Sequence, residues 1–398
     1  MMGASRPLEG IRVVELGQLI AGPFAGSVLA YFGAEVVKVE PPGGGDAIRG
    51  WRVLRDGTSY FWRMLGRNKK SVTLSLRTEE GRALARRLIE GADVVIENFR
   101  SGAMEAWGLG PEKFRECNPG LVYARVSGYG QTGPYSARPG YASVCEGIGG
   151  LRYLNGFPGE APVRPNLSLG DTLAGLHAAL GILLALVERG KSSRGQLVDV
   201  AIYESVFNML ESVVPEYDGE GLVREPSGTT LTGIVPTNTY PCRDGRHVII
   251  GGNGDAIYRR LMRAADRPDL ADDPRLAHNA GRVEHEKLID GALAEWTGSL
   301  DLDDVLARLA EADVPAGPIY SVADIMEDPH YRAREMFHRV EIDGEPLVLP
   351  AMSPRLDATP GGTEWPGPEL GSHNREILEE RLGLGKAELE ALRAKGVL

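Results

Sequence analysis

The stretch IRVVELGQLIAGPFAGSVLAYFGAEVVKVE, residues 11–40, contains a short apolar run, a segment with helical spacing and a second short apolar run. We predict a strand at 11–16, a helix at 23–32 and a strand at 34–40, which stops at the turn-forming sequence PPGGG. A strand, a helix and a strand in succession form the unit of a parallel sheet with helices on its faces. The stretch therefore predicts an α/β fold.

The same alternation continues through the first third of the chain. Residues 71–76 alternate like a strand, residues 78–91 have the spacing of a helix, and residues 93–97 and 121–126 again resemble strands. We therefore predict a doubly wound, Rossmann-like α/β domain.

A change in composition divides the chain into parts. Its 398 residues are enough for two or three domains of roughly 100 to 200 residues each. Residues 216–241 are rich in Gly, Thr and Pro, which is typical of a linker. We predict that residues 1–215 begin the large domain, that 242–330 form a smaller α+β domain, and that 331–398 return to the large domain.

The overall composition narrows the choice of partners. A formal net charge of −11 argues against DNA and RNA as ligands. Three cysteines without a CxxC pair argue against a disulfide framework and a cysteine zinc site, as in a reducing compartment. The N-terminal sequence has no signal-peptide-like apolar run. We expect a cytoplasmic protein without a metal, a nucleic-acid partner or a membrane partner.

The sequence SLGDT, residues 168–172, opens a predicted helix. Its most apolar part, 176–187, is about a dozen residues long, too short to span a bilayer, and we predict that it is buried. The carboxylate of Asp171 would lie at the positive end of the helix dipole, where backbone N–H groups hold an anion. Such a residue is either an N-cap or a nucleophile that must stay ionised and aimed. The local pattern leaves both interpretations open.

Positive charge is concentrated in the segment GRNKK, residues 66–70. Arg67, Lys69 and Lys70, together with Arg77 at the end of the next predicted strand, could bind phosphate groups. We favour the alternative, in which the same residues form a solvated basic face.

Two loops follow predicted strands. Residues 18–23 come after the first strand, at the carboxyl edge where α/β folds bind ligands, although a Gly-Pro helix start needs no ligand. Residues 251–254, with the sequence GGNG, form either a turn or a flexible cover over a site.

Several collinear blocks together point to one family. They are PLEGIRVVEL at 7–16, IAGPFAG at 20–26, FGAEVVKVEPPGGGD at 32–46, RNKKSVTLSL at 67–76, DVVIENFRSGAMEAWGLG at 93–110, SGYGQTGP at 127–134, LGDTLAGLHAALGILLAL at 169–186, RGQLVDVAIYESV at 194–206 and LGSHNREIL at 370–378. Over essentially the whole chain they resemble the family III CoA-transferases, the formyl-CoA transferase and carnitine CoA-transferase family. The resemblance is strongest to the succinyl-CoA-dependent dicarboxylate CoA-transferases.

The resemblance implies a set of site residues. Asp171 matches the catalytic aspartate of the family, and Arg77 resembles a basic contact for the nucleotide phosphates of CoA. Pro41 and Ala106 stand where the formyl-CoA transferases have basic CoA contacts, so the phosphate contacts differ in detail. The residues expected to line the CoA site are Ile20, Ala21, Leu74, Arg77, Asn98, Phe99 and Tyr141.

The resemblance also implies a reaction and an assembly. CoA would move from an acyl-CoA donor, succinyl-CoA, to a dicarboxylate acceptor through an anhydride and a CoA thioester on Asp171, with no prosthetic group. Gly251 and Gly252 are candidates for a cover that excludes water, and Arg164 either pairs with the distal carboxylate of the substrate or forms a structural ion pair. Two chains would form an interlocked homodimer.

Two alternative functions remain from the sequence. The same fold contains α-methylacyl-CoA racemases, which need a histidine and an acidic residue in a GHD-like sequence where this chain has Gly140, Tyr141 and Ala142. A tyrosine phenol is a poor base at neutral pH, which favours transfer over racemisation. The other alternative is a protein that binds CoA esters without catalysis, and the presence of Asp171 argues against it.

Overall fold

The computed structural model describes residues 6–398 and divides into two compact units. The large unit comprises the described residues up to Leu151, Pro165–Glu211 and Arg332–Leu398. The small unit comprises Arg152–Arg164 and Ser212–Tyr331.

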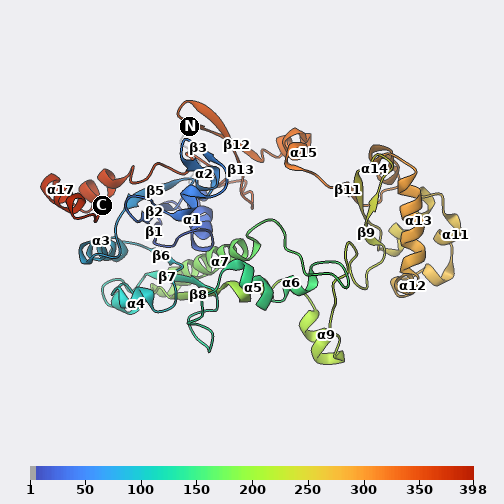
Figure 1. Ribbon diagram of the computed structural model, residues 1–398, viewed down its shortest axis with the longest axis horizontal. Helices are drawn as coiled ribbons and strands as arrows, with labels where there is room; N and C mark the ends of the chain where they lie inside the picture. Colours follow the sequence, from blue (N-terminus) through green and yellow to red (C-terminus); the bar gives the residue numbers. More distant parts are fainter. Residues whose placement is uncertain (1–5) are drawn as a thin grey trace. The chain divides into compact units, whose positions relative to one another are not determined.

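A six-stranded parallel sheet forms the centre of the large unit, and Figure 1 shows its strands in the order β5, β2, β1, β6, β7, β8. Numbered along the chain, this is the 3-2-1-4-5-6 order of the doubly wound fold, which confirms that prediction. The edge strand β8 was not predicted. The bounds are β1 Arg12–Glu15, β2 Glu35–Glu40, β5 Lys69–Thr73, β6 Val94–Glu97, β7 Val122–Ser127 and β8 Leu197–Ala201.

Alternating side chains give the sheet two apolar faces. Val13 and its neighbours in register pack beneath α1 (Ala21–Tyr31) and α7 (Leu169–Ser192). Val14 and its neighbours face the opposite layer, which contains α3 (Glu79–Glu90). The sheet is therefore buried on both sides, as a parallel sheet requires.

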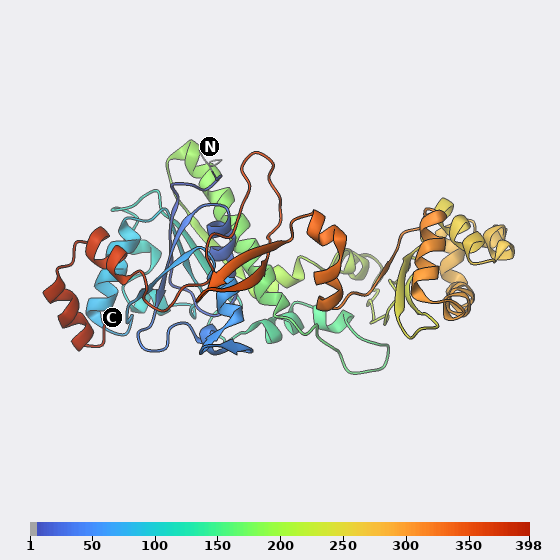
Figure 2. The same ribbon diagram turned by 90° about the horizontal axis from the view of Figure 1, so that it is seen from above.

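The C-terminal segment completes the layer around α3. The π-helix η4 (Arg375–Arg381) and α17 (Lys386–Ala394) add apolar side chains to this core and lie beside α3 in both views (Figures 1 and 2). The backbone N–H of Ser75 donates to the carbonyl of Val397 at 2.8 Å. Helix α17 was not predicted from the sequence. The same segment contains an antiparallel hairpin of β12 (Phe337–Ile342) and β13 (Glu345–Pro350).

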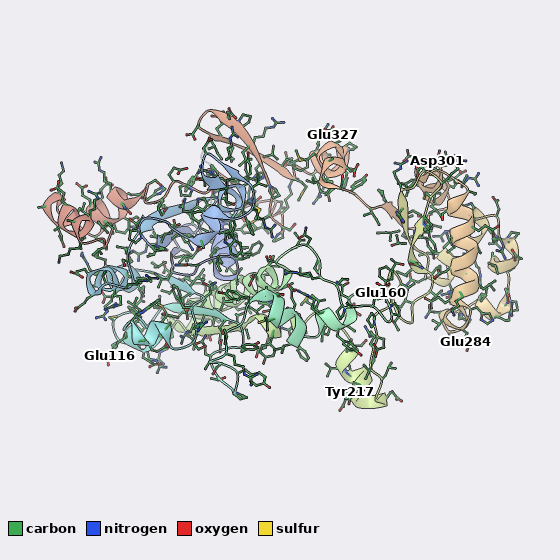
Figure 3. The ribbon with its side chains drawn as sticks, viewed as in Figure 1. Glu116, Glu160, Tyr217, Glu284, Asp301 and Glu327 are labelled. Carbon is green, nitrogen blue, oxygen red and sulfur yellow. The ribbon has the colours of Figure 1, made fainter. Side chains whose placement is uncertain are left out.

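The small unit has α+β architecture. Strands β11 (Ala316–Pro318), β10 (His247–Gly251) and β9 (Thr237–Pro241) form an antiparallel sheet. Figure 3 labels Glu284, which ends α12 (Asn279–Glu284), and Asp301, which precedes α14 (Leu302–Glu311). The other main helices are α10 (Asp255–Ala264) and α13 (Glu286–Gly298).

The prediction that residues 216–241 are only a linker was wrong. They contain the end of α9 (Val213–Glu220) and the whole of β9. Tyr240 on β9 is buried, and its hydroxyl donates to Asp290 at 2.6 Å. Strand β9 was not recognisable from the sequence. Only one of its side chains, that of Tyr240, is buried, so its Thr, Asn and Pro residues show no alternating apolar pattern.

The predicted basic surface at residues 66–70 is also wrong, because Arg67 and Lys69 are buried. The Lys69 ammonium lies 2.8 Å from a carboxylate oxygen of Glu15, and burial lowers the pKa of Lys69 to about 8 despite that carboxylate. Lys70 points to the other side of the strand and pairs with Glu35 and Glu376. These groups are structural, and most of their partners come from distant parts of the sequence.

The fully buried Lys38 connects two carboxylates. Its ammonium lies 3.1 Å from Glu15 and 2.8 Å from Asp46, and both carboxylates are fully buried as well. Burial alone would lower the pKa of Lys38, but the carboxylates of Asp46 and Glu15 raise it above its ordinary value. Gly26 on α1 approaches the same cluster so closely that an added Cβ would lie 1.8 Å from a Glu15 oxygen.

Helix α7 is less buried than predicted. It has 24 residues, and by length and composition it could cross a membrane, a test that core helices of soluble proteins also pass. Its small residues Ala174 and Ala178 pack inwards. Its opposite side leaves four apolar side chains 46–62% exposed, namely Leu176, Leu180, Leu184 and Val187.

The buried cluster makes Lys38 far more important for stability than Lys70. We expect Lys38→Met to lower the free energy of unfolding by about 3 to 5 kcal/mol, because Glu15 and Asp46 lose a buried counter-charge. The control Lys70→Met removes two partly exposed ion pairs on the adjacent strand β5 and should cost about 0 to 1 kcal/mol. Urea denaturation followed by circular dichroism measures both, and equal losses would contradict the assignment.

Candidate active site

A pocket of about 290 Å³ opens at the carboxyl ends of β1, β6 and β7. The sheet order reverses between β1 and β6, so the loops after these strands diverge and leave a crevice. The pocket lies wholly within the large unit. Its lining residues are Gln18–Ala21, Trp51, Asn98–Ser101, Val126–Gly128, Ser136, Arg138–Tyr141, Asp171 and Ile202.

Buried groups hold the loop that forms one wall of this pocket. The Lys38 ammonium donates to the carbonyl of Gly17, and the carboxylate of Asp46 accepts the backbone N–H of Leu19 at 3.0 Å. Leu19 has a φ of 64°, a conformation that is strained for a residue with a side chain. The Asp46 carboxylate compensates for this strain, so the charge cluster fixes the shape of the loop.

Asn98 joins this loop to the loop after β6. Its side-chain oxygen accepts the N–H of Gln18 at 2.7 Å, and its amide nitrogen donates to the carbonyl of Gln18 at 2.8 Å. The preceding Glu97 is buried and accepts the N–H of Phe99 at 2.8 Å and the Nε of Arg125 at 2.8 Å. Burial nevertheless raises the pKa of Glu97 to about 7.

Asp171 is the third residue of α7, and Ser168 occupies the N-cap position. The interpretation of Asp171 as an N-cap was therefore wrong. Its half-buried carboxylate lies in the first turn, near the positive end of the helix dipole. Burial, followed by the negative charges of Asp171 and Glu146, raises the pKa of Cys145 to about 11, which shows that all three groups are neighbours.

Glu146 anchors the start of α7 through a hydrogen bond. This fully buried carboxylate on α5 (Ala142–Ile148) accepts the backbone N–H of Gly170 at 3.1 Å. A Cβ at Gly170 would lie 3.2 Å from the Cγ of Glu146, so the residue before Asp171 favours glycine. Sequence reasoning missed Glu146, although a single carboxylate among small and apolar residues was an available signal.

The structure brings six predicted residues to this pocket: Ile20, Ala21, Asn98, Phe99, Tyr141 and Asp171. Leu74 and Arg77 line a second pocket of about 480 Å³. The two pockets share Gln18 and Phe99 in their walls. Besides Glu146, sequence reasoning missed Trp51, Arg100 and Arg138 as site residues.

The remaining predicted residues belong to the small unit. Arg164 ends its first segment, and Gly251 ends β10. The N–H groups of Gly251 and Gly252 donate to the carbonyls of Pro315 and Pro236, both at 2.9 Å. The first half of the glycine segment is therefore anchored to the backbone of its own unit.

Asp171 brings a carboxylate into this pocket. Asp171 is half-buried at a helix start, and the pocket walls combine apolar side chains with polar loops. A carboxylate of this kind can attack an activated acyl carbon without a separate base. Within residues 6–398, no three His, Cys, Asp or Glu side chains are grouped to hold a metal ion.

Comparison with known proteins places this geometry in a family. The sequence model of CoA-transferase family III matches residues 8–374. The chain is 48% identical over 395 residues to the succinyl-CoA–D-citramalate CoA-transferase of Chloroflexus aurantiacus, covering 99% of this chain and 98% of the relative. It is 35% identical over 384 residues to the succinate–glutarate CoA-transferase of Agrobacterium fabrum, covering 94% and 95%.

A solved structure gives the same result. The crystal structure of a CaiB/BaiF family protein from Brucella suis superimposes with a TM-score of 0.83 at 35% identity, over 94% of this chain and 99% of that protein. The chain therefore belongs to CoA-transferase family III and is a CoA-transferase whose substrates are CoA thioesters.

Proposed function

We propose that this enzyme transfers CoA from succinyl-CoA to a dicarboxylate acceptor, with Asp171 as the covalent nucleophile. The observation that carries the proposal is the position of Asp171, in the first turn of α7 and in the pocket where the sheet order reverses. The names of the relatives, a succinyl-CoA–D-citramalate and a succinate–glutarate CoA-transferase, support the choice of acids.

The first half-reaction loads CoA onto the enzyme. The Asp171 carboxylate attacks the thioester carbonyl of succinyl-CoA, the C–S bond breaks, and CoA leaves as a thiolate. This step leaves a mixed anhydride of succinate and Asp171. The thiolate then attacks the Asp171 carbonyl of the anhydride, which releases succinate and leaves Asp171 as a CoA thioester.

The second half-reaction repeats these steps in reverse order. The acceptor carboxylate attacks the Asp171 thioester, releases the thiolate and forms a new anhydride with Asp171. The thiolate attacks the acceptor carbonyl of this anhydride, which yields the product acyl-CoA and the free Asp171 carboxylate. Each acyl bond is exchanged for another activated bond, so no energy source beyond the donor thioester is needed.

The chain's own residues position the reactants. Arg77 lines the second pocket, which suits the phosphates of CoA, and Gln18 and Phe99 line both pockets. The pantetheine arm can therefore run from Arg77 past these two residues to Asp171. Gly251 and Gly252 of the small unit remain proposed contributors to a cover that keeps water from the anhydride.

Replacing Asp171 separates its chemical role from its structural one. Asp171→Asn should reduce CoA transfer at least about a thousandfold, because an amide cannot form the anhydride. The free energy of unfolding should change by only about 0.3 to 1 kcal/mol, the value of a charge in a first helical turn. A coupled assay of acyl-CoA exchange and urea denaturation provide the two measurements.

Glu79→Gln is the matched control, since it makes the same chemical change in the first turn of α3. This variant should keep wild-type activity. In addition, wild-type enzyme incubated with succinyl-CoA and then hydroxylamine should carry its mass change on the peptide that contains Asp171. Full activity of Asp171→Asn, or labelling of another acidic residue, would reject the nucleophile, and CoA binding without exchange would favour a non-catalytic role.

Racemisation is tested directly. Tyr141 and Ala142 occupy the positions where a racemase needs its histidine and acid, and Tyr141 is 70% exposed. We expect that the enzyme, incubated with a 2-methylacyl-CoA in deuterated water, incorporates no deuterium at the α-carbon. Mass spectrometry of the acyl-CoA measures this. Catalytic incorporation of deuterium would favour the alternative that the protein is a racemase.

We also propose that two chains form a homodimer, interlocked as in the family. The exposed apolar side of α7, with Leu180, Leu184 and Val187, supports a covered surface because such a stripe is costly in water. Light scattering should give about twice the chain mass of 42.9 kDa, with no folded monomer on dilution. A stable, active monomer would contradict the proposal.

A further inference from the structure

The active-site pocket contains two arginines that the mechanism above does not use. Arg100 and Arg138 both line the pocket that contains Asp171. Neither guanidinium has an acidic side chain within 4.0 Å among the described residues. The pocket therefore offers positive charge that no residue of the large unit neutralises.

Arg138 is held in place by an aromatic stack. Its guanidinium carbon lies 3.7 Å from the centre of the Tyr135 ring, and Tyr135 meets the buried Tyr129 edge to face at 5.9 Å. The backbone N–H of Arg138 donates to the carbonyl of Tyr135 at 2.8 Å, which closes the turn that carries both residues. Stacking orients the guanidinium, but its N–H groups donate no hydrogen bond to any described residue.

Arg100 lacks this support. It has neither an acidic partner nor an aromatic ring beneath its guanidinium among residues 6–398. A preoriented planar group loses less entropy on binding an anion than a free side chain does. Of the two arginines, Arg138 is thus the better preformed anion site.

A dicarboxylate substrate creates the need for such a site, and this step rests on the proposed function. When one carboxylate reacts at Asp171, the other enters the same pocket as a second negative charge, which is unfavourable without a cation. A guanidinium binds a carboxylate through two parallel hydrogen bonds. We propose that Arg138 binds the distal carboxylate of the substrate and so determines specificity for dicarboxylates.

The order of the reaction extends this role to both substrates. The donor acid leaves before the acceptor enters, and each in turn forms an anhydride with the side-chain carboxyl group of Asp171. Their distal carboxylates consequently occupy the same place one after the other. Arg138 acts on donor and acceptor alike.

The test compares substrates that differ only in the distal carboxylate. Succinyl-CoA and butyryl-CoA serve as donors, and glutarate and pentanoate serve as acceptors. For Arg138→Gln, we expect kcat/KM to fall about 10- to 100-fold for both dicarboxylates, as for the loss of a hydrogen bond to a charged group. The values for butyryl-CoA and pentanoate should stay within about threefold of wild type. Arg138→Lys keeps the positive charge but cannot form two parallel hydrogen bonds. Its kcat/KM values for the dicarboxylates should lie between those of wild type and Arg138→Gln.

Control variants separate this role from others. Arg393→Gln changes an exposed arginine on α17 outside both pockets and should alter none of the four values. Equal losses for all substrates in Arg138→Gln, with weaker inhibition by free CoA, would mean that Arg138 contacts the CoA phosphates and would overturn the proposal. A selective loss in Arg100→Gln or Arg164→Gln, with none in Arg138→Gln, would overturn it in favour of that residue.

Binding provides a readout that is independent of turnover. Calorimetry should show that Arg138→Gln weakens the binding of succinyl-CoA but not of butyryl-CoA, and an unchanged ratio would reject the inference. If the wild-type enzyme exchanges CoA only between monocarboxylates, the dicarboxylate assignment fails and the inference fails with it, while the transferase reaction stands. Melting temperatures of all variants verify that the fold is retained.

Discussion

Lys38 is a fully buried cation on which the position of the active-site loop depends. Its ammonium holds Glu15 at the end of β1, Asp46 in the loop after β2 and the carbonyl of Gly17. A buried charge is tolerated only when its counter-charges are present, because removing one of them leaves the other charge uncompensated. The set also orients Asp46, which accepts the N–H of the strained Leu19. The cluster beneath the sheet edge thus determines the wall of the pocket above it.

The rest of the site is built on this wall by short-range contacts. Asn98 ties the loop after β6 to Gln18 through two hydrogen bonds, so the two loops that diverge at the reversal of the sheet are held at a fixed separation. On the other side of the pocket, Glu146 holds the N–H of Gly170 and thereby fixes the residue next to Asp171. Lys38, Asp46 and Glu146, which shape the site, are buried and bonded to protein atoms, whereas Asp171, Arg100 and Arg138 line the pocket itself.

Elements with a regular local pattern were predicted correctly from the sequence. The predictions failed for residues whose burial depends on partners far away in the sequence. Strands β1, β2, β6 and β7 and helices α1 and α3 were predicted because their apolar spacing is regular. Lys69 was misassigned because its partner Glu15 is 54 residues away, and Arg67 is covered by residues near 350 and 363. Asp171 was found through the family resemblance, whereas its place in the third helical position required the structure. Arg138 was missed because a single arginine in a turn has no local pattern.

The contrast between two carboxylates of the large unit supports Asp171, and not Glu97, as the proposed nucleophile. Glu97 is almost fully buried and accepts bonds from Arg125 and Phe99, yet burial raises its pKa to about 7. A nucleophile in that position would be protonated for part of the time at neutral pH, and only its ionised fraction could attack a thioester. Asp171 is only half-buried and lies in the first turn of a 24-residue helix, where the dipole favours a negative charge. The proposed reaction makes two opposing demands, because an anhydride must be shielded from water while an attacking carboxylate must be ionised, and a half-buried position at a helix start suits both demands.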